Sequence, residues 1–455
     1  MRTANYKKRL AMGVAVIALG VAPAQAETLK EALATAYQNN PIIEGQRASV
    51  RAEDENVSQA LSGYRPTISG QASIAKSRSR NFFDANGGKQ TLTPLSASIS
   101  AEQPLFRSFR TYNAVKESKT RVEAARSGLT STEQDVLLNT VAAYMDVLRD
   151  QAVLDLRRNN VQVLDRQLGA SRDRFEVGEI TRTDVAQSEA RKSGAISTRT
   201  AAEADLTASR TAYERIVGNA PGTLEQPEPM GAMPDSEGKA IEIALSENPE
   251  LKAARLEEEA ARQAISTAKS ELGPEFGLVA QYEYQEDQFV RGFSASTASI
   301  MAQARVPIYA AGVTSSKIRQ AKQVNSQRRM QAIETEREIR EAVSNAWERL
   351  RAARAIIESS KSQVDANKIA LEGVRQEQEV GSRTTLDVLD AEQEMLDAEV
   401  ELVRARRDEY VASFQLLSAM GRATAEALNL PVERYDPERY YDHATGSWFG
   451  WGTGD

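Results

Sequence analysis

The sequence is poor in the residue types that enzymes and metal sites most often use. Its 455 residues include no cysteine and a single histidine, His443, and only 6% of them are aromatic. The chain can therefore form no disulfide bond and no thiolate metal site. It also has no glycine-rich loop for phosphate groups and no metal-spaced cluster. These absences argue against an enzyme, and we expect no catalytic residues, no cofactor and no metal ion.

Long apolar runs are also missing, apart from a short one at the amino terminus. Residues 10–21 are apolar, a Lys-Lys-Arg triplet precedes them at 7–9, and Ala-Gln-Ala follows at 24–26. This order of basic, apolar and small residues is typical of a secretory signal peptide. A membrane anchor, the alternative, needs about 20 apolar residues. We therefore predict that residues 1–26 are removed on export.

The remaining chain is acidic and has the composition of long helices. The full sequence carries a net charge of −7, and residues 1–26 contain four basic and no acidic residues, so the mature chain carries −11. An acidic chain is a poor partner for nucleic acid. Charged residues make up 27% of the sequence, with abundant Ala, Glu, Arg and Gln, which is typical of long helices.

Most of the chain is a tandem repeat of one unit of about 200 residues. From Pro104 and Pro307 onward the two copies keep a constant interval of 203 positions, as between Gly178 and Gly381. The matched landmarks are Asn40-Pro41 with Asn248-Pro249, Pro66 with Pro274, Pro104 with Pro307, Gly178 with Gly381, Asp184 with Asp387, and Gly218 with Gly421. A length difference falls before Pro104, where the first copy has the loop residues 84–88.

The repeat defines the predicted domains. We expect a first repeat over 27–218, a linker over 219–237, a second repeat over 238–421 and a tail over 422–455. The linker and the tail would gather as a belt around the middle of the molecule.

Each repeat contains a predicted β-hairpin, at about 66–106 and about 274–309. Apolar and polar residues alternate there, as in the run from Thr67 to Ile74. Aromatic residues cluster near the strand ends: Tyr64, Phe82, Phe83, Phe106, Phe109, Phe289, Phe293 and Tyr309. Such strands suit a membrane β-barrel, although a soluble hairpin covering a core has the same alternation. Four strands cannot close a membrane barrel, so a barrel requires several chains.

Long helical hairpins follow the strands. The segments from Arg110 to Gly178 and from Val313 to Gly381 would each form a helix of about 100 Å. Glycine ends each helix where a left-handed backbone is needed, and the Thr and Asp that follow can cap the returning helix. Residues spaced alternately by four and three predict a coiled-coil seam. Before the tip it consists of Ile339, Val343, Ala346, Leu350, Ala353, Ile357, Ser360, Val364, Asn367, Leu371, Val374 and Gln378, and after the tip of Val388, Ala391, Met395, Ala398, Leu402 and Ala405.

An acidic stripe lies one position ahead of the second seam. Its members are Asp387, Asp390, Glu394, Asp397 and Glu401, and the first copy has Asp184, Gln187, Arg191, Gly194 and Thr198 at the equivalent positions. Only the second copy therefore presents a continuous acidic face. The face is either an ordinary solvated helix surface or the lining of a pore.

The chain resembles the TolC family of outer-membrane efflux and secretion channels. The similarity rests on the two copies, the Asn-Pro pairs, the strand ends Pro104-Leu105-Phe106 and Pro307-Ile308-Tyr309, and the tip from Gly381 to Asp390. It implies a homotrimer in the outer membrane of a Gram-negative bacterium. Three chains would share a twelve-stranded barrel, continued by an α-helical barrel through the periplasm. It also implies a periplasmic adaptor and an inner-membrane transporter of the ABC or RND type.

The resemblance also implies roles for residues at the tips. Asp387 and Asp390 match the aspartates that ring the periplasmic entrance of the family. Gly178 and Gly381 lie in the tips on which the adaptor docks.

A lock that holds the entrance shut is implied as well. Arg383 matches an arginine of this lock, and Thr183 and Asp184 match its contacts on the neighbouring hairpin. The best-known members carry Tyr where this chain has Gln378, and that Tyr bonds to the position of Asp184. Gln can also donate a hydrogen bond at this position, but its reach is shorter than that of Tyr.

The predicted function is the exit duct of a tripartite efflux or type I secretion system, which exports small toxic molecules or proteins. The alternative is a periplasmic coiled-coil scaffold or adaptor without a pore. The sequence does not identify the cargo.

Overall fold

The computed structural model describes residues 27–80, 89–228, 230 and 233–453. The predicted signal peptide at 1–26, the loop at 84–88 and the aromatic residues Phe82 and Phe83 lie outside these described residues.

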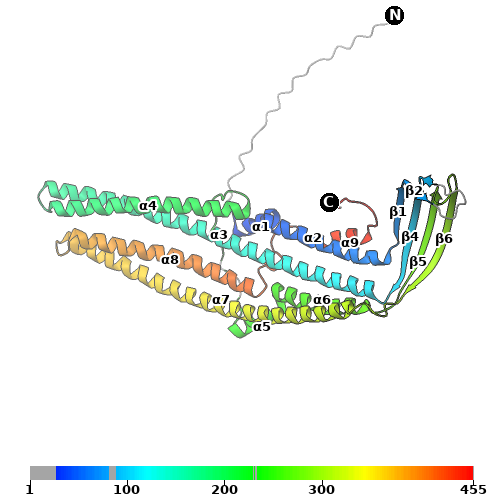
Figure 1. The fold of residues 1–455 in the computed structure, drawn as a ribbon. Coiled ribbons are helices and arrows are strands. Elements are labelled where there is room, and N and C mark those ends of the chain that lie inside the picture. Colours follow the sequence, from blue (N-terminus) through cyan, green and yellow to red (C-terminus); the bar gives the residue numbers. More distant parts are fainter. Residues whose placement is uncertain (1–26, 81–88, 229, 231–232, 454–455) are drawn as a thin grey trace, which may run out of the picture.

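The described chain is a long, bent molecule with a sheet at one end and two helical hairpins at the other (Figure 1). The first repeat contains α1 (Leu29–Asn39), α2 (Pro41–Leu61), the 3-10 turn η1 (Ser62–Tyr64), β1 (Thr67–Ile74), β2 (Ser77–Arg80), β3 (Lys89–Leu92), β4 (Leu95–Arg107), α3 (Arg110–Glu176) and α4 (Arg182–Val217). The second contains α5 (Glu237–Glu247), α6 (Pro249–Ser270), β5 (Glu275–Glu286), β6 (Ser294–Arg305), α7 (Val313–Glu379) and α8 (Thr385–Ala419), and the tail contains α9 (Pro437–Gly446). The predicted fold of two repeats, each with a hairpin of strands and long paired helices, is confirmed.

The two predicted β-hairpins join into one antiparallel sheet in the order β1-β4-β5-β6. The register of β5 and β6 places apolar residues opposite each other, as for Ala280 and Ile300. The register of β1 and β4 places hydroxyl groups opposite each other, and the Oγ atoms of Ser69 and Ser100 are 2.8 Å apart. The apolar face is uncovered in the single chain, where Ile300 is 82% exposed. The soluble hairpin that packs on a core is therefore not what the structure shows. The separate ribbon of β2 and β3 was not predicted.

None of the helices in the described residues combines the length and the apolar character that a membrane span requires.

The Asn of each Asn-Pro pair serves three helix ends: it ends one short helix, begins the next, and bonds to the end of the returning helix. The side-chain oxygen of Asn40 accepts from the backbone N–H of Ile42 at 2.9 Å and begins α2, while its amide donates to the carbonyl of Ile216 near the end of α4 at 2.8 Å. Asn248 repeats this between α6 and α8, with a bond of 3.0 Å to the carbonyl of Ala419. Both asparagines are buried. The motif therefore fixes where each returning helix ends against the next short helix.

The predicted seam pairs α7 with α8 inside the second hairpin. All its residues on α7 are buried or partly buried, from Ile339 at 5% exposure to the partly buried Gln378, and so are those on α8. The first hairpin pairs α3 with α4 in the same way. Since α3 and α7 both have 67 residues, the two hairpins reach the same distance from the sheet.

The linker is tied to the middle of the helical part. The hydroxyl of Tyr144 contacts the carbonyl oxygens of Glu27 at 2.8 Å and Glu225 at 2.6 Å. The hydroxyl of Tyr213 donates to the Glu27 carboxylate at 2.6 Å, and a β-bridge joins Glu27 to Leu224. Both tyrosines are fully buried. The start of the chain and the linker therefore meet on the same core.

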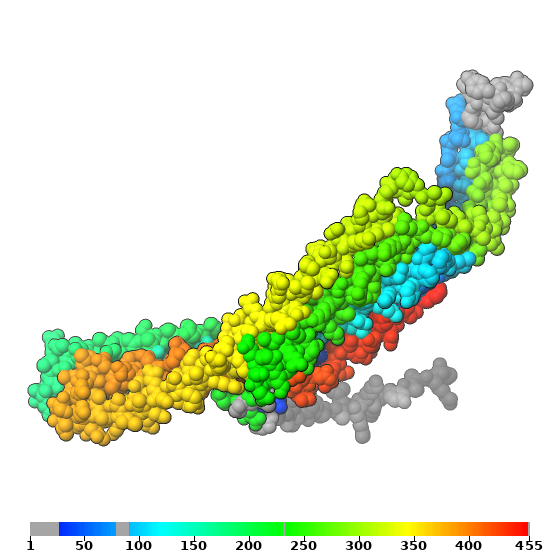
Figure 2. Space-filling model, turned by 90° about the horizontal axis from the view of Figure 1, so that it is seen from below, coloured from blue at the N-terminus to red at the C-terminus, as the bar shows by residue number. Residues whose placement is uncertain are grey.

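The carboxyl-terminal tail extends from the middle of the molecule toward the sheet. It runs along the side of the molecule opposite α7, next to α3 (Figure 2), and α9 packs against α2. Arg65, just before β1, donates to the carbonyls of Thr445 at 3.2 Å and Ser447 at 3.0 Å. The first part of the tail, with Ala425 and Leu430, shares a core with Leu224 of the linker, as the belt prediction expects, whereas the tail ends near the base of the sheet.

The two hairpin tips have the same local structure. Gly178 and Gly381 both have φ of +80°, and the next residue's N–H bonds back to a carbonyl of the last helical turn. Thr181 and Thr384 then begin α4 and α8 with capping boxes completed by Asp184 and Asp387. The predicted left-handed glycines and the predicted Thr and Asp caps are confirmed.

We expect Gly381→Val to loosen the tip and Gly381→Asn to be tolerated. A Cβ added at this glycine would meet no atom within 4 Å, so the cost is that of the left-handed backbone, about 1–2 kcal/mol for most residues and least for Asn. Limited proteolysis should cleave the Val variant faster at the tip. Gly373→Val is the control, because Gly373 lies inside α7 and is equally free of neighbours. Equal cleavage of all three variants would contradict the requirement for a positive φ.

A buried carboxylate lies between α2, α3 and α9. Asp54 is fully buried, and neither of its oxygens has a hydrogen-bond partner among the described residues. Burial raises its pKa to about 6, although Arg126, at 3.9 Å, acts in the opposite direction, and Glu438, Glu55 and Glu53 raise it further. The charged form of Asp54 therefore destabilises the folded chain at neutral pH.

We expect Asp54→Asn to raise the melting temperature at pH 7.5 and to change it little near pH 4. The folded state binds the Asp54 proton more tightly than the unfolded state, whose pKa is 3.8, so stability falls as pH rises from about 4 to about 6. Asn removes this dependence. Glu123→Gln on α3 is the control and should keep the wild-type profile, because Glu123 is exposed and is not among the groups that act on Asp54. A lower melting temperature of Asp54→Asn at pH 7.5 would show that its attraction to Arg126 outweighs burial.

Candidate functional site at the hairpin tips

The two tips lie next to each other at the end of the molecule furthest from the sheet (Figure 1). A small apolar cluster joins them, formed by Leu164 of α3, Ala195 of α4 and Leu389 of α8, with Val161 packed against it. All three core members are buried, and Leu389 is only 2% exposed. The cluster holds α8 against the first hairpin beside the acidic stripe.

Asp387, the first acid of the stripe, has a local structural role. Its carboxylate accepts the backbone N–H of Thr384 at 2.8 Å and the Thr384 hydroxyl at 2.7 Å. These two hydrogen bonds, the backbone one first, lower the pKa of Asp387, and Arg383 lowers it further. Asp184 makes the same bonds with Thr181, and its pKa is lowered for the same reason. Both carboxylates are therefore ionised at neutral pH.

Asp390 pairs with an arginine of the other repeat. Arg191 of α4 donates from Nη2 to Oδ1 of Asp390 on α8, and both side chains remain about half exposed. Further along α8, Asp397 lies 3.8 Å from Arg157 of α3. Part of the acidic stripe thus faces the first hairpin and is charge-paired with it. In the sequence, Arg191 occupies a position of the first repeat that is equivalent to the acidic stripe, but the sequence did not indicate that Asp390 is its partner.

Arg383 is held within its own hairpin. Its Nε donates to the carboxylate of Glu377 at 2.9 Å, and its Nη1 lies 3.8 Å from Asp387. These contacts place its charge at the tip beside the first acid of the stripe.

The expected lock is not formed within one chain. In the described part of the chain, no hydrogen bond or ion pair joins Arg383 or Gln378 to Thr183 or Asp184. Gln378 lies partly buried at the end of the seam, and Thr183 is exposed. The role of these four residues in a contact between chains stays a prediction.

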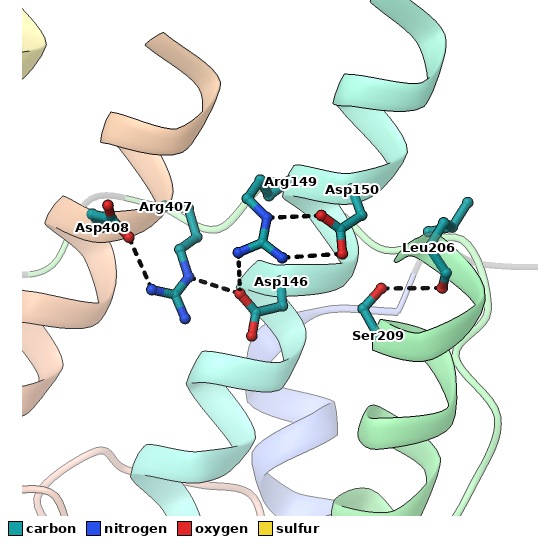
Figure 3. A network of polar contacts seen from close by, with 7 residues as sticks. All are labelled: Asp146, Arg149, Asp150, Leu206, Ser209, Arg407 and Asp408. Carbon is teal, nitrogen blue, oxygen red and sulfur yellow. Dashed lines mark hydrogen bonds and ion pairs between the residues drawn. The ribbon is translucent and has the colours of Figure 1, made fainter. Parts of the chain in front are cut away.

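A second charged network joins the hairpins near the middle of the molecule (Figure 3). Asp146 of α3 accepts from Nη1 of Arg149 and from Nε of Arg407 on α8, both at 2.8 Å. Arg149 also donates to Asp150 at 2.7 Å, and Arg407 to Asp408 at 2.9 Å. A cavity of about 580 Å³ lies beside this network between α3, α4 and α8. Within this network, the ion pair of Asp146 with Arg407 links the two hairpins away from the tips.

No group of three or more His, Asp or Glu side chains in the described residues has an arrangement that could hold a metal ion.

Comparison with known proteins identifies the family. The family model described as outer membrane efflux protein matches this chain twice, over residues 32–219 and 240–422. The outer membrane efflux protein BepC of Brucella suis biovar 1 is 39% identical over 435 residues, which cover 95% of this chain and 93% of that protein. The outer membrane protein TolC of Vibrio cholerae is 28% identical over 405 residues, which cover 87% of this chain and 91% of that protein.

A solved structure has the same fold. The outer-membrane channel CmeC of Campylobacter jejuni superposes with a TM-score of 0.77 over 92% of this chain and 89% of that chain, at 14% identity. The alternative of a scaffold without a pore finds no support among these proteins. The chain belongs to the outer membrane efflux protein family, and it is an outer-membrane channel protein that extends into the periplasm.

Proposed function

We propose that three copies of this chain form the exit duct of a tripartite export system. The observation that carries this proposal is the open sheet: β1 and β6 are unpaired edges, and its apolar face is exposed. Open edges are not viable in lipid, so β6 of one chain pairs with β1 of the next. Three sheets of four strands close a twelve-stranded barrel.

The length of the helices supports the proposed partners. From the base of the sheet, 67 residues of α3 or α7 span about 100 Å, so the tips reach deep into the periplasm. There Gly178 and Gly381 would present the tips to a periplasmic adaptor, which joins the duct to an inner-membrane transporter of the ABC or RND type. The cargo is a small toxic molecule or a protein, chosen by that transporter.

The acids at the tip supply the electrostatics of the entrance. In a trimer, Asp387 and Asp390 repeat three times around one axis, and a ring of carboxylates attracts cations. Asp387 is ionised because of its bonds to Thr384. Asp390 is about half exposed beside Arg191, so it contributes a partly compensated charge. We therefore propose a cation-selective pore with low conductance until the tip opens.

Light scattering of the purified protein in detergent should give a trimer. The reason is the pair of free edges in each four-stranded sheet, which only neighbouring chains can satisfy in lipid. Unfolded protein under the same conditions is the control and should give the mass of one chain. A folded monomer that is stable in detergent would contradict the shared barrel.

Replacing both acids, Asp387→Ala with Asp390→Ala, should weaken block by multivalent cations roughly tenfold and reduce cation preference. The measurements are block and reversal potential in planar bilayers under a salt gradient. Because Asp387 also caps α8, the control is Asp184→Ala with Gln187→Ala, which removes the equivalent cap but no acid of the stripe.

Full multivalent block in the double variant at 387 and 390 would place these acids outside the pore. Equal effects of the two double variants would assign the change to the lost helix caps instead.

A further inference from the structure

The carboxyl-terminal tail ends in a group of aromatic side chains that the chain itself leaves uncovered. Trp448, Phe449 and Trp451 lie close together in the sequence, and we call them the tail aromatic group. Phe449 is 94% exposed and Trp451 is fully exposed. Two of the three tryptophans of the whole sequence belong to this group. Exposed apolar groups of this kind mark a contact with another protein or with a membrane.

Arg65 fixes the level of this group relative to the sheet. Its guanidinium donates to the carbonyls of Thr445 and Ser447 and lies 4.9 Å from the centre of the Trp448 ring. Arg65 stands two positions before Thr67, the first residue of β1. The tail aromatic group therefore lies level with the end of the sheet at which the helices begin.

Contacts of α9 hold the tail at this level. Helix α9 lies beside the part of α2 that leads to the sheet (Figure 1). Arg126 of α3 pairs with Glu438 and lies 5.4 Å from the centre of the Tyr441 ring. The hydroxyl of Tyr440 donates to Glu55 of α2 at 2.9 Å. The tail is therefore attached to both α2 and α3 before it reaches the aromatic group.

The strands carry aromatic rings at the same level. Thr67 lies opposite Glu102, so Arg65, two positions earlier, is level with the part of β4 that contains Phe106. Phe106 lies opposite Phe276 of β5, and their ring centres are 6.2 Å apart. The tail aromatic group and these two rings therefore lie at one end of the sheet.

The strand rings mark the end of the apolar face. Phe276 is four positions from Ala280, and side chains at even intervals along a strand point to the same face. Ala280 lies opposite Ile300, which is exposed on the apolar face. In a membrane barrel, aromatic rings gather where the apolar face meets the lipid headgroups. In this outer-membrane protein, the base of the sheet therefore marks the depth of the periplasmic headgroups.

The residues around the tail aromatic group suit a lipid surface. Residues 447–453 contain no charged side chain, and charges are the costly groups to bring into a bilayer. Arginines stand at the neighbouring strand ends, because Arg107 of β4 and Arg305 of β6 both lie opposite Glu275. Positive charges at this depth match the phosphates of lipid headgroups. The base of the sheet thus combines aromatic rings for the interface with arginines for phosphates.

We propose that the end of the tail is an interfacial anchor, in which Trp448, Phe449 and Trp451 insert among the headgroups of the phospholipids that face the periplasm. Tryptophan suits this role because its ring is largely apolar while its N–H donates to a headgroup. The anchor ties α9, and through it α2 and α3, to the membrane surface beside the sheet. It requires the sheet to lie in the membrane but does not require the trimer.

Tryptophan fluorescence tests the anchor, and the sequence offers a suitable background. The third tryptophan, Trp347 of α7, packs against the core that contains Leu350 and Leu416. Trp347→Phe leaves Trp448 and Trp451 as the only tryptophans. The variant is placed in bilayers of phosphatidylcholine that carries bromine atoms, a contact quencher, either near the headgroup or near the ends of the acyl chains. Iodide in the buffer reports contact with water.

Bromine near the headgroup should quench the emission at least about twofold, and bromine near the chain ends should quench it less. Quenching by iodide alone would place the rings in water, and quenching by neither would place them against protein. Either result would overturn the anchor. Light scattering separates this test from that of the proposed duct. Headgroup quenching in a monomer would support the anchor while contradicting the duct.

The matched control carries Trp448→Phe with Trp451→Phe and keeps Trp347 alone. Because Trp347 packs on the core of the helical part, brominated lipid should leave its emission unchanged. Equal quenching of this control and of the Trp347→Phe variant would show that the lipid contact is not specific to the tail, and would overturn the anchor.

A charge within the group gives an independent measurement. In the Trp347→Phe background, Phe449→Glu places a carboxylate between the two tryptophans. Quenching by brominated lipid should then fall at least about twofold, and quenching by iodide should rise. His443→Glu is the control, because it adds a carboxylate at an exposed position of α9 and should keep the lipid quenching. Equal lipid quenching in the two variants would contradict insertion of the rings.

Discussion

Backbone groups in a bilayer have no water to bind, and this constraint determines the rest of the structure. The sheet β1-β4-β5-β6 has two unpaired edges, which only other chains can complete. The connections from strands to helices are short: α3 begins three positions after the end of β4, and α7 soon follows β6. The helices therefore follow one another around the axis in the same order as the strands of a closed barrel. Hairpins of the first and second repeat must then alternate around the axis. The helical duct is in this sense a continuation of the barrel.

Stability within the helical part is graded. The second hairpin is held by a seam rich in small residues, such as Ala346, Ala353 and Ser360, which bury little area per turn but continue along the 35 residues of α8. Near the tip, the two hairpins contact each other through the small apolar cluster of Leu164, Ala195 and Leu389 and through ion pairs that stay partly exposed and weak. Toward the middle of the molecule, Phe414 of α8 lies in the large core that also contains Leu137 of α3 and Tyr213 of α4. The contact between the hairpins is therefore weaker near the tip than near the middle.

Local chemistry could be predicted from the sequence, and long-range pairing could not. The left-handed Gly381, the cap made by Thr384 and Asp387, and the seam depend on neighbours within a few residues or on a fixed period. Arg191 has the sequence surroundings of any surface helix, while its partner Asp390 lies 199 residues away. The ribbon of β2 and β3 and the path of the tail also depend on tertiary contacts, such as that of Arg65 with the carbonyl of Ser447.

Divergence between the repeats decides how charge is distributed at the tip. Two identical copies would have given every interface the same residues, but Arg191 stands where the second repeat has Glu394, and Asp390 stands where the first has Gln187. Asp390 is consequently shared between Arg191 and solvent. Among the described residues, Asp387 has its ionic partner, Arg383, on its own hairpin, and its bonds to Thr384 keep it ionised. The carboxylate that caps the start of α8 is therefore also a charge of the tip that Arg383 balances in part.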